Sequence, residues 1–174
     1  NLTASGCTLS NATDSATLTA STSGTCTITA TKAATTNYFS ATSTLVFTFV
    51  KASTTTNLVS SHSAVTYGTT FYETATVSPS SATGTVSFFN NGNPVTGCSS
   101  VNLVSGVAVC STWKPSVGIY DSITATYSGG TNHLTSSSSG VSLEITKANL
   151  VVTPDNKNVV YGGSAPTYTF TYQG

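Results

Sequence analysis

One stretch of sequence occurs twice in this chain, about one hundred residues apart. Ile-Thr-Ala-Thr begins at residue 28 and again at residue 123, and each copy leads through a second strand-like stretch to a Lys-Ala pair. The two lysines, Lys51 and Lys147, are 96 positions apart. A period near one hundred residues is typical of β-sandwich domains arranged in tandem. The repeat therefore predicts a row of similar β modules.

Apolar and polar residues alternate with a period of two in the repeated segments. Val141, Leu143 and Ile145 alternate with Ser, Glu and Thr, as expected of a strand with one buried face. No segment shows the spacing of an amphipathic helix over several turns. The predicted fold class is all-β with antiparallel sheets.

The central module is expected to span residues 52–147 and to form a complete sandwich. Its strands are predicted at 54–59, 71–77, 84–89, 101–104, 107–110, 120–127 and 141–146. The pairs Asn91-Gly92 and Ser105-Gly106 lie between strands. Such pairs indicate tight turns, because glycine and asparagine tolerate a positive φ.

The segments on either side of the central module are predicted to be incomplete half-domains. Residues 1–51 contain only the closing strands of a module, and residues 148–174 contain only opening strands, expected at 150–153 and 167–172. A lone pair of strands is marginally stable in water. We therefore expect strands from another subunit, or from the next repeat of a longer polypeptide, to complete each half. The two boundary lysines are expected to be solvated linker charges.

The composition limits the classes of partner. Only 6% of residues are charged and the net charge is zero, so there is no electrostatic reason to expect nucleic acid or an anionic membrane as a partner. No apolar run approaches the ~20 residues of a membrane-spanning helix. Ser and Thr exceed a third of the chain; disordered mucin-like stalks share this content, but the strict alternation favours a folded protein. A hydroxyl-rich surface with few lysines and no arginine suits an extracellular protein exposed at the cell surface.

Four cysteines permit three disulfide connectivities. We favour Cys7 with Cys26 and Cys98 with Cys110, because each pair brackets a hairpin-like stretch inside one module. Counting across the intervening turn puts Cys110 opposite Val101, so the second bridge requires a longer loop or a bulge. Buried free thiols are the alternative, and the absence of a Cys-x-x-Cys motif disfavours zinc.

The sequence contains no arrangement typical of an enzyme. Its five acids are spread along the chain, at Asp14, Glu73, Asp121, Glu144 and Asp155. No two are close enough in sequence to indicate a general acid–base pair, and no phosphate-binding glycine loop is present. We assign no catalytic, metal-binding or cofactor-binding residue and expect no cofactor.

An aromatic contact face is a weaker hypothesis. Trp113 and three tyrosines near the end of the chain, Tyr161, Tyr168 and Tyr172, are candidates for a face that stacks on sugars. Aromatic residues in sandwiches more often pack in cores or between domains. Glycans are therefore kept only as an alternative partner.

Several motifs resemble those of a known family. Residues 52–147 are similar to the bacterial immunoglobulin-like (Ig-like) repeats of large secreted proteins, through Gly-Thr-Val-Ser-Phe at 84–88, Gly-Val-Ala-Val at 106–109 and Ile-Thr-Ala-Thr-Tyr-Ser-Gly-Gly at 123–130 with Asn132 close behind. The module departs from the family pattern by adding a cysteine pair, and by carrying His133 where an aromatic such as Tyr38 is usual.

The flanking segments resemble related domains. Residues 148–174 are similar to the start of the MBG domain, through Leu-Val-Val-Thr-Pro-Asp at 150–155 and Val-Tyr-Gly-Gly-Ser-Ala-Pro-Thr at 160–167. Residues 7–51 resemble the end of a Cys-bearing bacterial Ig-like repeat, through Gly-Thr-Cys-Thr-Ile-Thr-Ala at 24–30 and the pair Asn37-Tyr38.

These resemblances imply tandem Ig-like β-sandwiches in a surface-exposed spacer, adhesin or fibre protein without catalytic residues. With the two half-domains, they lead to the hypothesis of an extracellular structural protein. It would be the repeating unit of a bacterial surface filament, joined head to tail to other copies of itself or to adjacent repeats. The alternatives are an adhesin or glycan-binding stalk module, and a spacer that holds a distant enzyme away from the cell wall.

Overall fold

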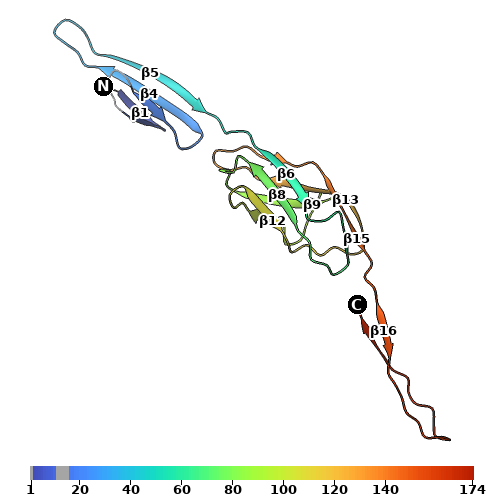
Figure 1. The fold of residues 1–174 in the computed structure, drawn as a ribbon. Helices are drawn as coiled ribbons and strands as arrows, with labels where there is room; N and C mark the ends of the chain where they lie inside the picture. Colours follow the sequence, from blue (N-terminus) through green and yellow to red (C-terminus); the bar gives the residue numbers. More distant parts are fainter. Residues whose placement is uncertain (1, 11–15) are drawn as a thin grey trace.

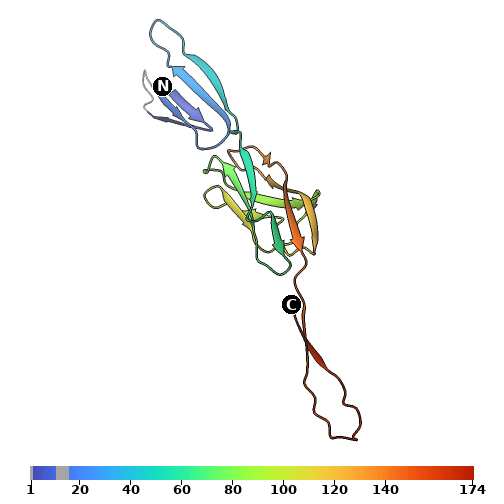
Figure 2. The same cartoon turned by 45° about the vertical axis from the view of Figure 1, so that its right-hand side comes forward.

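The computed structural model describes residues 2–10 and 16–174. These residues form strands, turns and loops, in three successive units along an elongated molecule (Figure 1). The all-β fold class is confirmed. The N-terminal unit and the C-terminal hairpin lie at opposite ends of the central sandwich, and the rotated view gives the same arrangement (Figure 2).

The N-terminal unit is one open sheet with a short hairpin beside it. Its strands are β1 (Leu2–Ser5), β2 (Thr8–Ser10), β3 (Thr17–Thr19), β4 (Gly24–Lys32) and β5 (Ala41–Phe49). The sheet has the order β1-β4-β5, β2 pairs with β3, and all pairs are antiparallel. Cys26 is the one fully buried apolar side chain among the described residues of this unit. The described unit therefore has no hydrophobic core of its own.

The central unit is a sandwich of two sheets. Its strands are β6 (Thr55–Ser60), β7 (Ala64–Thr66), β8 (Glu73–Ser78), β9 (Thr85–Asn90), β10 (Asn93–Pro94), β11 (Val101–Asn102), β12 (Val107–Cys110), β13 (Gly118–Tyr127), β14 (Ser136–Ser137) and β15 (Val141–Thr146). One sheet has the order β10-β9-β13-β15-β7, with β11 on β9 and β14 on β13, and the other has the order β12-β8-β6.

Alternation along the strands places the core between these sheets. Ala75 and Val77 on β8 face inward, as do Ile123, Ala125 and Tyr127 on β13, and all five are buried. Full burial of one large apolar side chain stabilises a fold by about 1.5–3 kcal/mol. The central unit therefore has the core that the N-terminal unit lacks.

Most expected strands of the central unit occur within one or two residues of their predicted positions, but the two-residue strands β10 and β14 were missed, and so was β7. It pairs with β15 in the parallel sense, with Val65 opposite Ile145. Three residues are too few to show an alternating pattern. The segment predicted at 101–104 is shorter than expected, because the chain turns between Val104 and Val107, whose backbones exchange two hydrogen bonds.

The C-terminal unit is a long hairpin. Its strands are β16 (Val151–Pro154) and β17 (Phe170–Gln173), which pair in the antiparallel sense. Every residue of both strands is exposed. None of residues 148–174 is buried in the described structure.

Candidate functional site

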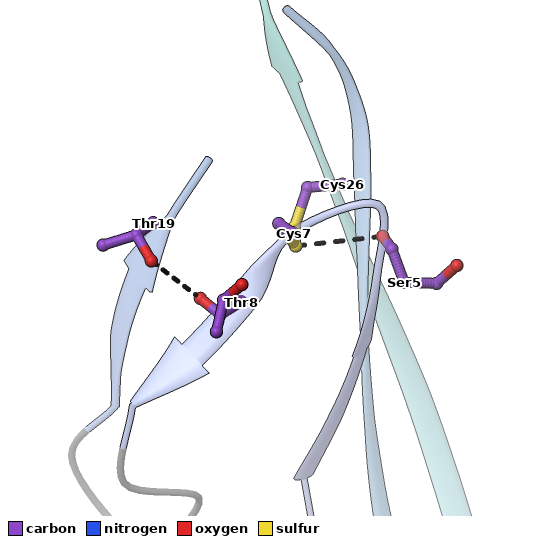
Figure 3. Close-up of a disulfide and its surroundings, with 5 residues drawn as sticks. All are labelled: Ser5, Cys7, Thr8, Thr19 and Cys26. Atoms are coloured by element: carbon purple, nitrogen blue, oxygen red, sulfur yellow. Dashed lines mark hydrogen bonds between the residues drawn. A yellow bond between two sulfur atoms is a disulfide. The ribbon is translucent and has the colours of Figure 1, made fainter. Parts of the chain in front are cut away.

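Both predicted cysteine pairs are disulfides. Cys7 is bonded to Cys26 and Cys98 to Cys110, with Cα–Cα distances of 5.4 and 5.5 Å. Figure 3 shows the first bridge, which ties the turn between β1 and β2 to β4, the middle strand of the N-terminal sheet. The predicted connectivity is confirmed, and each bridge lies within one unit.

The Cys98–Cys110 bridge joins the two sheets of the sandwich, which residue counting did not foresee. Val101 on β11 lies in the sheet of β9, whereas Cys110 on β12 pairs with β8 in the opposite sheet. The two strands that leave the tight turn between them separate into different sheets. Cys110 therefore does not lie opposite Val101, and the bridge spans the core rather than a single hairpin.

Trp113 is part of the packing at one end of the central sandwich. It is half-buried and lies edge-on to Phe71 and Tyr120, with ring centroids 5.9 and 5.3 Å away. Beside it is a pocket of about 320 Å³, whose lining includes Val65, Phe71, Lys114, Pro115 and Ile145.

The three candidate tyrosines lie elsewhere. Tyr161, Tyr168 and Tyr172 belong to the exposed C-terminal unit, where Tyr172 contacts Phe170 edge-on at 5.1 Å. The structure brings Trp113 into ring contact with core residues and not with these tyrosines. The described chain therefore does not assemble the four rings into one face.

Glu73 is the buried acid of the central core. Ser60 Oγ donates a hydrogen bond to its Oε1 at 2.9 Å, while Oε2 has no partner within the described residues. Burial raises the pKa of the Glu73 carboxyl, and the Ser60 hydrogen bond partly offsets this rise. No other acid is buried in the described chain, and Asp14 lies outside it. The described residues contain no group of three or more His, Cys, Asp or Glu side chains placed to hold a metal ion.

A network of hydrogen bonds joins the N-terminal unit to the central sandwich. At its centre is Asn132, in the loop between β13 and β14. Its Oδ1 accepts from the Ser23 N–H at 2.8 Å, and its Nδ2 donates to the Ser21 carbonyl at 2.8 Å. Both polar groups of one side chain thus bind the backbone of the loop that precedes β4. We call this pair of bonds the Asn132 clasp.

Two side chains of the N-terminal unit and the linker reinforce the clasp. Ser23 Oγ donates to the Thr131 carbonyl at 2.9 Å, and Lys51 Nζ donates to the Gly130 carbonyl at 2.8 Å. Lys51 is an exposed charge in the linker, as predicted, and its ammonium group also holds the linker to the clasp loop, which the sequence did not predict.

The linker backbone completes the junction. The Ala52 N–H donates to the Asn132 carbonyl at 2.8 Å, and the Leu134 N–H donates back to the Ala52 carbonyl at 2.8 Å. These bonds form a short parallel bridge between Ala52 and His133. The chain is thus held against the clasp loop at the point where it enters the sandwich.

The clasp loop is in turn fixed to the core. Tyr127 is fully buried and its hydroxyl donates to the Thr83 carbonyl at 2.6 Å. The Ser128 N–H donates to the Thr85 carbonyl, and Ser128 Oγ accepts from the Thr85 N–H. A Cβ at Gly130 would lie 2.6 Å from the Thr83 carbonyl oxygen, so only glycine fits. These contacts fix the loop that carries Asn132 to the buried core of the sandwich.

The central unit can now be placed among known proteins. The model of the bacterial Ig-like domain (group 3) matches residues 58–146, just over half of the chain. The chain belongs to the bacterial Ig-like family. No curated protein and no solved structure matches it. The matched residues lie inside the module expected at 52–147.

Membership places this Ig-like chain in a class of surface or extracellular structural modules that is typically non-enzymatic. The two disulfides agree with an oxidising extracellular environment. In the described residues no helix is long and apolar enough to cross a membrane. The more specific resemblances of residues 7–51 and 148–174 remain predictions.

The sequence did not predict which residues join the Ig-like module to the N-terminal unit. Asn132 was noted as part of a family motif, but its partners lie 109 and 111 positions away and offer only backbone groups. One signal was present in the sequence. An asparagine followed by a ring residue occurs in both copies of the repeat, as Asn37-Tyr38 and as Asn132-His133.

Proposed function

We propose that this protein is an extracellular structural protein, the repeating unit of a bacterial surface fibre. Neighbouring units join head to tail, because the C-terminal hairpin of one and the N-terminal sheet of the next complete each other as one Ig-like sandwich. The partner is a second copy of this chain. The observation that carries the proposal is that the two terminal units contain complementary sets of strands.

The N-terminal sheet corresponds to the closing half of the Ig-like module. Its Gly24 pairs with Phe49 across β4 and β5, as Gly118 pairs with Ile145 across β13 and β15. Both glycines have a positive φ, 147° and 157°. β1 lies on the other side of β4, as β9 does on the other side of β13. The unit thus repeats the order β9-β13-β15 of the larger sheet.

The C-terminal hairpin corresponds to the opening half. β16 pairs with β17 in the same sense as β6 pairs with β8, with Val152 opposite Tyr172 where the module has Thr56 opposite Val77. The turn after β7 contains Tyr67-Gly68, and the hairpin contains Tyr161-Gly162. Both glycines are in the left-handed region, with φ of 88° and 79°. The hairpin therefore carries the counterparts of β6 and β8, and of the turn that follows β7.

The residues that the other half would cover are apolar and exposed. In the module, Leu143 on β15 has an exposed fraction of 0%, whereas its counterpart Phe47 on β5 has 40%, and Leu45 on the same face of β5 has 57%. On the hairpin, Phe170 and Tyr172 take the places of Ala75 and Val77 and are also exposed. Exposed apolar strands of this kind favour pairing with another chain.

Such a contact is heterologous, because one end of a molecule binds the opposite end of another. Unless the rotation between units closes a ring, repeated addition gives an open filament. The elongated arrangement of the three units, with the two unpaired halves at its opposite ends, favours the open outcome (Figure 1).

The experiment is electron microscopy and light scattering of the full chain over a range of concentrations. We expect rods that lengthen with concentration. Phe47→Asp should abolish them, because the counterpart Leu143 is fully buried and an unpaired buried charge costs several kcal/mol. Val46→Asp is the matched control on the opposite face of β5, where the counterpart Ser142 is exposed, and it should still give rods. Wild-type particles that stay monomeric at every concentration would contradict the proposal.

The pocket beside Trp113 favours a second candidate, an adhesin or glycan-binding stalk module. At about 320 Å³ it lies at the lower end of the ~300–1,000 Å³ usual for ligand sites. This candidate predicts glycan-array binding that Trp113→Ala abolishes while rod formation persists. An array without signal would exclude it for the glycans tested.

A further inference from the structure

We propose that the Asn132 clasp has a second copy between molecules, in which Asn37 of one molecule binds the backbone of residues 115–117 in a second copy of this chain. The inference rests on the proposed function and names the surface that aligns successive units. It goes beyond strand completion, because the clasp joins whole modules rather than two halves of one module.

Asn37 occupies the same place in its unit as Asn132 does in the central module. The Thr35 N–H donates to the Tyr38 carbonyl at 2.9 Å, and the Gly130 N–H donates to the His133 carbonyl at 3.0 Å. Each asparagine lies one residue before the acceptor of that bond, in the loop after β4 or after β13. Asn37 is exposed, and no hydrogen bond of its side chain occurs in the described chain. Asn37 therefore offers the same amide group as Asn132, but no backbone group among the described residues of its own chain binds it.

The binding partner of Asn37 in this proposed intermolecular joint is the loop at residues 115–117. Because Gly24 corresponds to Gly118, the loop that contains Ser21 and Ser23 corresponds to the loop that contains Pro115 and Val117. The clasp uses one carbonyl and one N–H, and Pro115 and Val117 retain these groups. In the described residues neither group has another partner. The change of side chains therefore leaves the binding groups intact.

The linkers match as well. Lys147 and Ala148 follow β15 as Lys51 and Ala52 follow β5. By the correspondence, Lys147 Nζ of the second copy donates to the Thr35 carbonyl of the molecule that supplies Asn37, as Lys51 Nζ donates to the Gly130 carbonyl within the chain. Every polar group of the observed junction except the Ser23 hydroxyl thus has a counterpart in the proposed one.

The two halves cannot meet within one molecule. The loop between β4 and β5 is at the outer end of the N-terminal unit, and the linker after β15 is at the opposite end of the central sandwich (Figures 1 and 2). The occupant of each half is therefore another copy.

Apolar groups around both halves support the contact. Tyr38 and Phe39, beside Asn37, have exposed fractions of 77% and 97%. The loop at 115–117 adjoins the pocket beside Trp113, whose lining includes Pro115. Docking Asn37 on this loop brings these two exposed rings next to the partly apolar pocket, which favours association.

The test compares the same substitution at two exposed asparagines, one inside the proposed contact and one outside it, in the full chain. Asn37→Ala removes two intermolecular hydrogen bonds and should raise the concentration at which rods form by about tenfold or more. Asn102→Ala, at an exposed position of β11 outside both the Asn132 clasp and the proposed contact, should leave that concentration unchanged. Both side chains are exposed, so both variants should keep the circular dichroism spectrum of the wild type.

A cross-linking experiment locates the contact directly. The double variant Asn37→Cys with Val117→Cys should form a ladder of disulfide-linked oligomers on oxidation. The control, Asn37→Cys with Val104→Cys, places the second thiol on an exposed turn outside the proposed joint and should give no ladder.

The outcomes separate this inference from the function on which it rests. Rods that form equally well in Asn37→Ala and wild type, without a ladder, would overturn the joint and leave head-to-tail assembly in place. A wild type that never assembles overturns both. Rods weakened only by Asn37→Ala, with a ladder only in the Asn37–Val117 pair, support both.

Discussion

At the scale of single residues, uncharged side chains make the contacts that order this molecule. Asn132 binds two backbone groups of the neighbouring unit, and Tyr127 binds the Thr83 carbonyl beneath it. A chain that is more than a third Ser and Thr, with few charges, joins its units by amides and hydroxyls. The amide of Asn132 and the hydroxyl of Ser23 carry no charge, so the hydrogen bonds that these two side chains make across the junction do not depend on a protonation state.

Residue types predicted the covalent contacts better than the hydrogen bonds. The spacing of four cysteines indicated the correct pairing, because each pair brackets one local stretch. The role of Asn132 could not be predicted, because its partners are backbone groups that any residue provides. Glu73 was recognised only as an isolated acid, although the apolar residues at even spacing from it, Ala75 and Val77, indicate that it shares the inward face of β8.

Tyr127→Phe should lower the free energy of unfolding of the central module by about 1–2 kcal/mol, because the Thr83 carbonyl loses its hydrogen bond in a buried setting. Urea titration followed by the fluorescence of Trp113, the single tryptophan, measures this. Tyr72→Phe, at a half-exposed tyrosine, is the control and should change little. Equal losses in both variants would contradict the assigned role.

Glu73 should make the central module less stable as pH rises. Burial raises its pKa in the folded state above the 4.5 of an unperturbed glutamate, so between these two pKa values the folded state binds more protons than the unfolded state. The stabilising contribution is present below about pH 4.5 and is lost as pH increases through the folded pKa. Glu73→Gln removes this dependence and should be the more stable protein at pH 7.

Urea titrations at pH 4 and pH 7 check the expectation for Glu73. Glu144→Gln, at an exposed acid on β15, is the control and should follow the wild type at both values. An identical pH dependence in wild type and Glu73→Gln would show that the Glu73 carboxyl does not titrate as expected.

At the scale of strands and sheets, alternation predicted which segments form strands but not how they are shared between sheets. The strands on either side of the turn at Ser105 were expected to form one hairpin, yet β11 pairs with β9 and β12 with β8. Alternation of apolar and polar residues identifies the buried face of a strand, but it does not show in which of the two sheets the strand lies. β7 was missed for a related reason: this three-residue segment is a strand because it pairs with β15, which is distant in the sequence.

The inter-sheet disulfide should stabilise the central module by about 3 kcal/mol, as a loop of this length predicts. Replacing Cys98 and Cys110 together by alanine should shift the urea transition of Trp113 fluorescence by that amount. Replacing Cys7 and Cys26 instead should leave this transition in place, because that bridge lies within the N-terminal unit. A shift of equal size in both double variants would show that the units do not unfold separately.

At the scale of the whole molecule, the repeat predicted the modular order and left the relation between modules open. The period of 96 residues between Lys51 and Lys147 separates equivalent points at which the chain passes from one unit to the next. How one unit sits on the next depends on the clasp, which appears only when residues more than one hundred positions apart are brought together. Sequence periodicity therefore predicts the units, and the structure is needed for the joint.

The parallel pairing of β7 with β15 has a mechanical consequence for the proposed fibre. The chain enters through β6 at the clasp end and leaves through β15 at the other end (Figure 1). Tension along such a fibre would shear β7 against β15, so the three paired positions from Ala64 to Thr66 would carry the load together. We therefore expect each module to resist stretching along the axis of the proposed fibre.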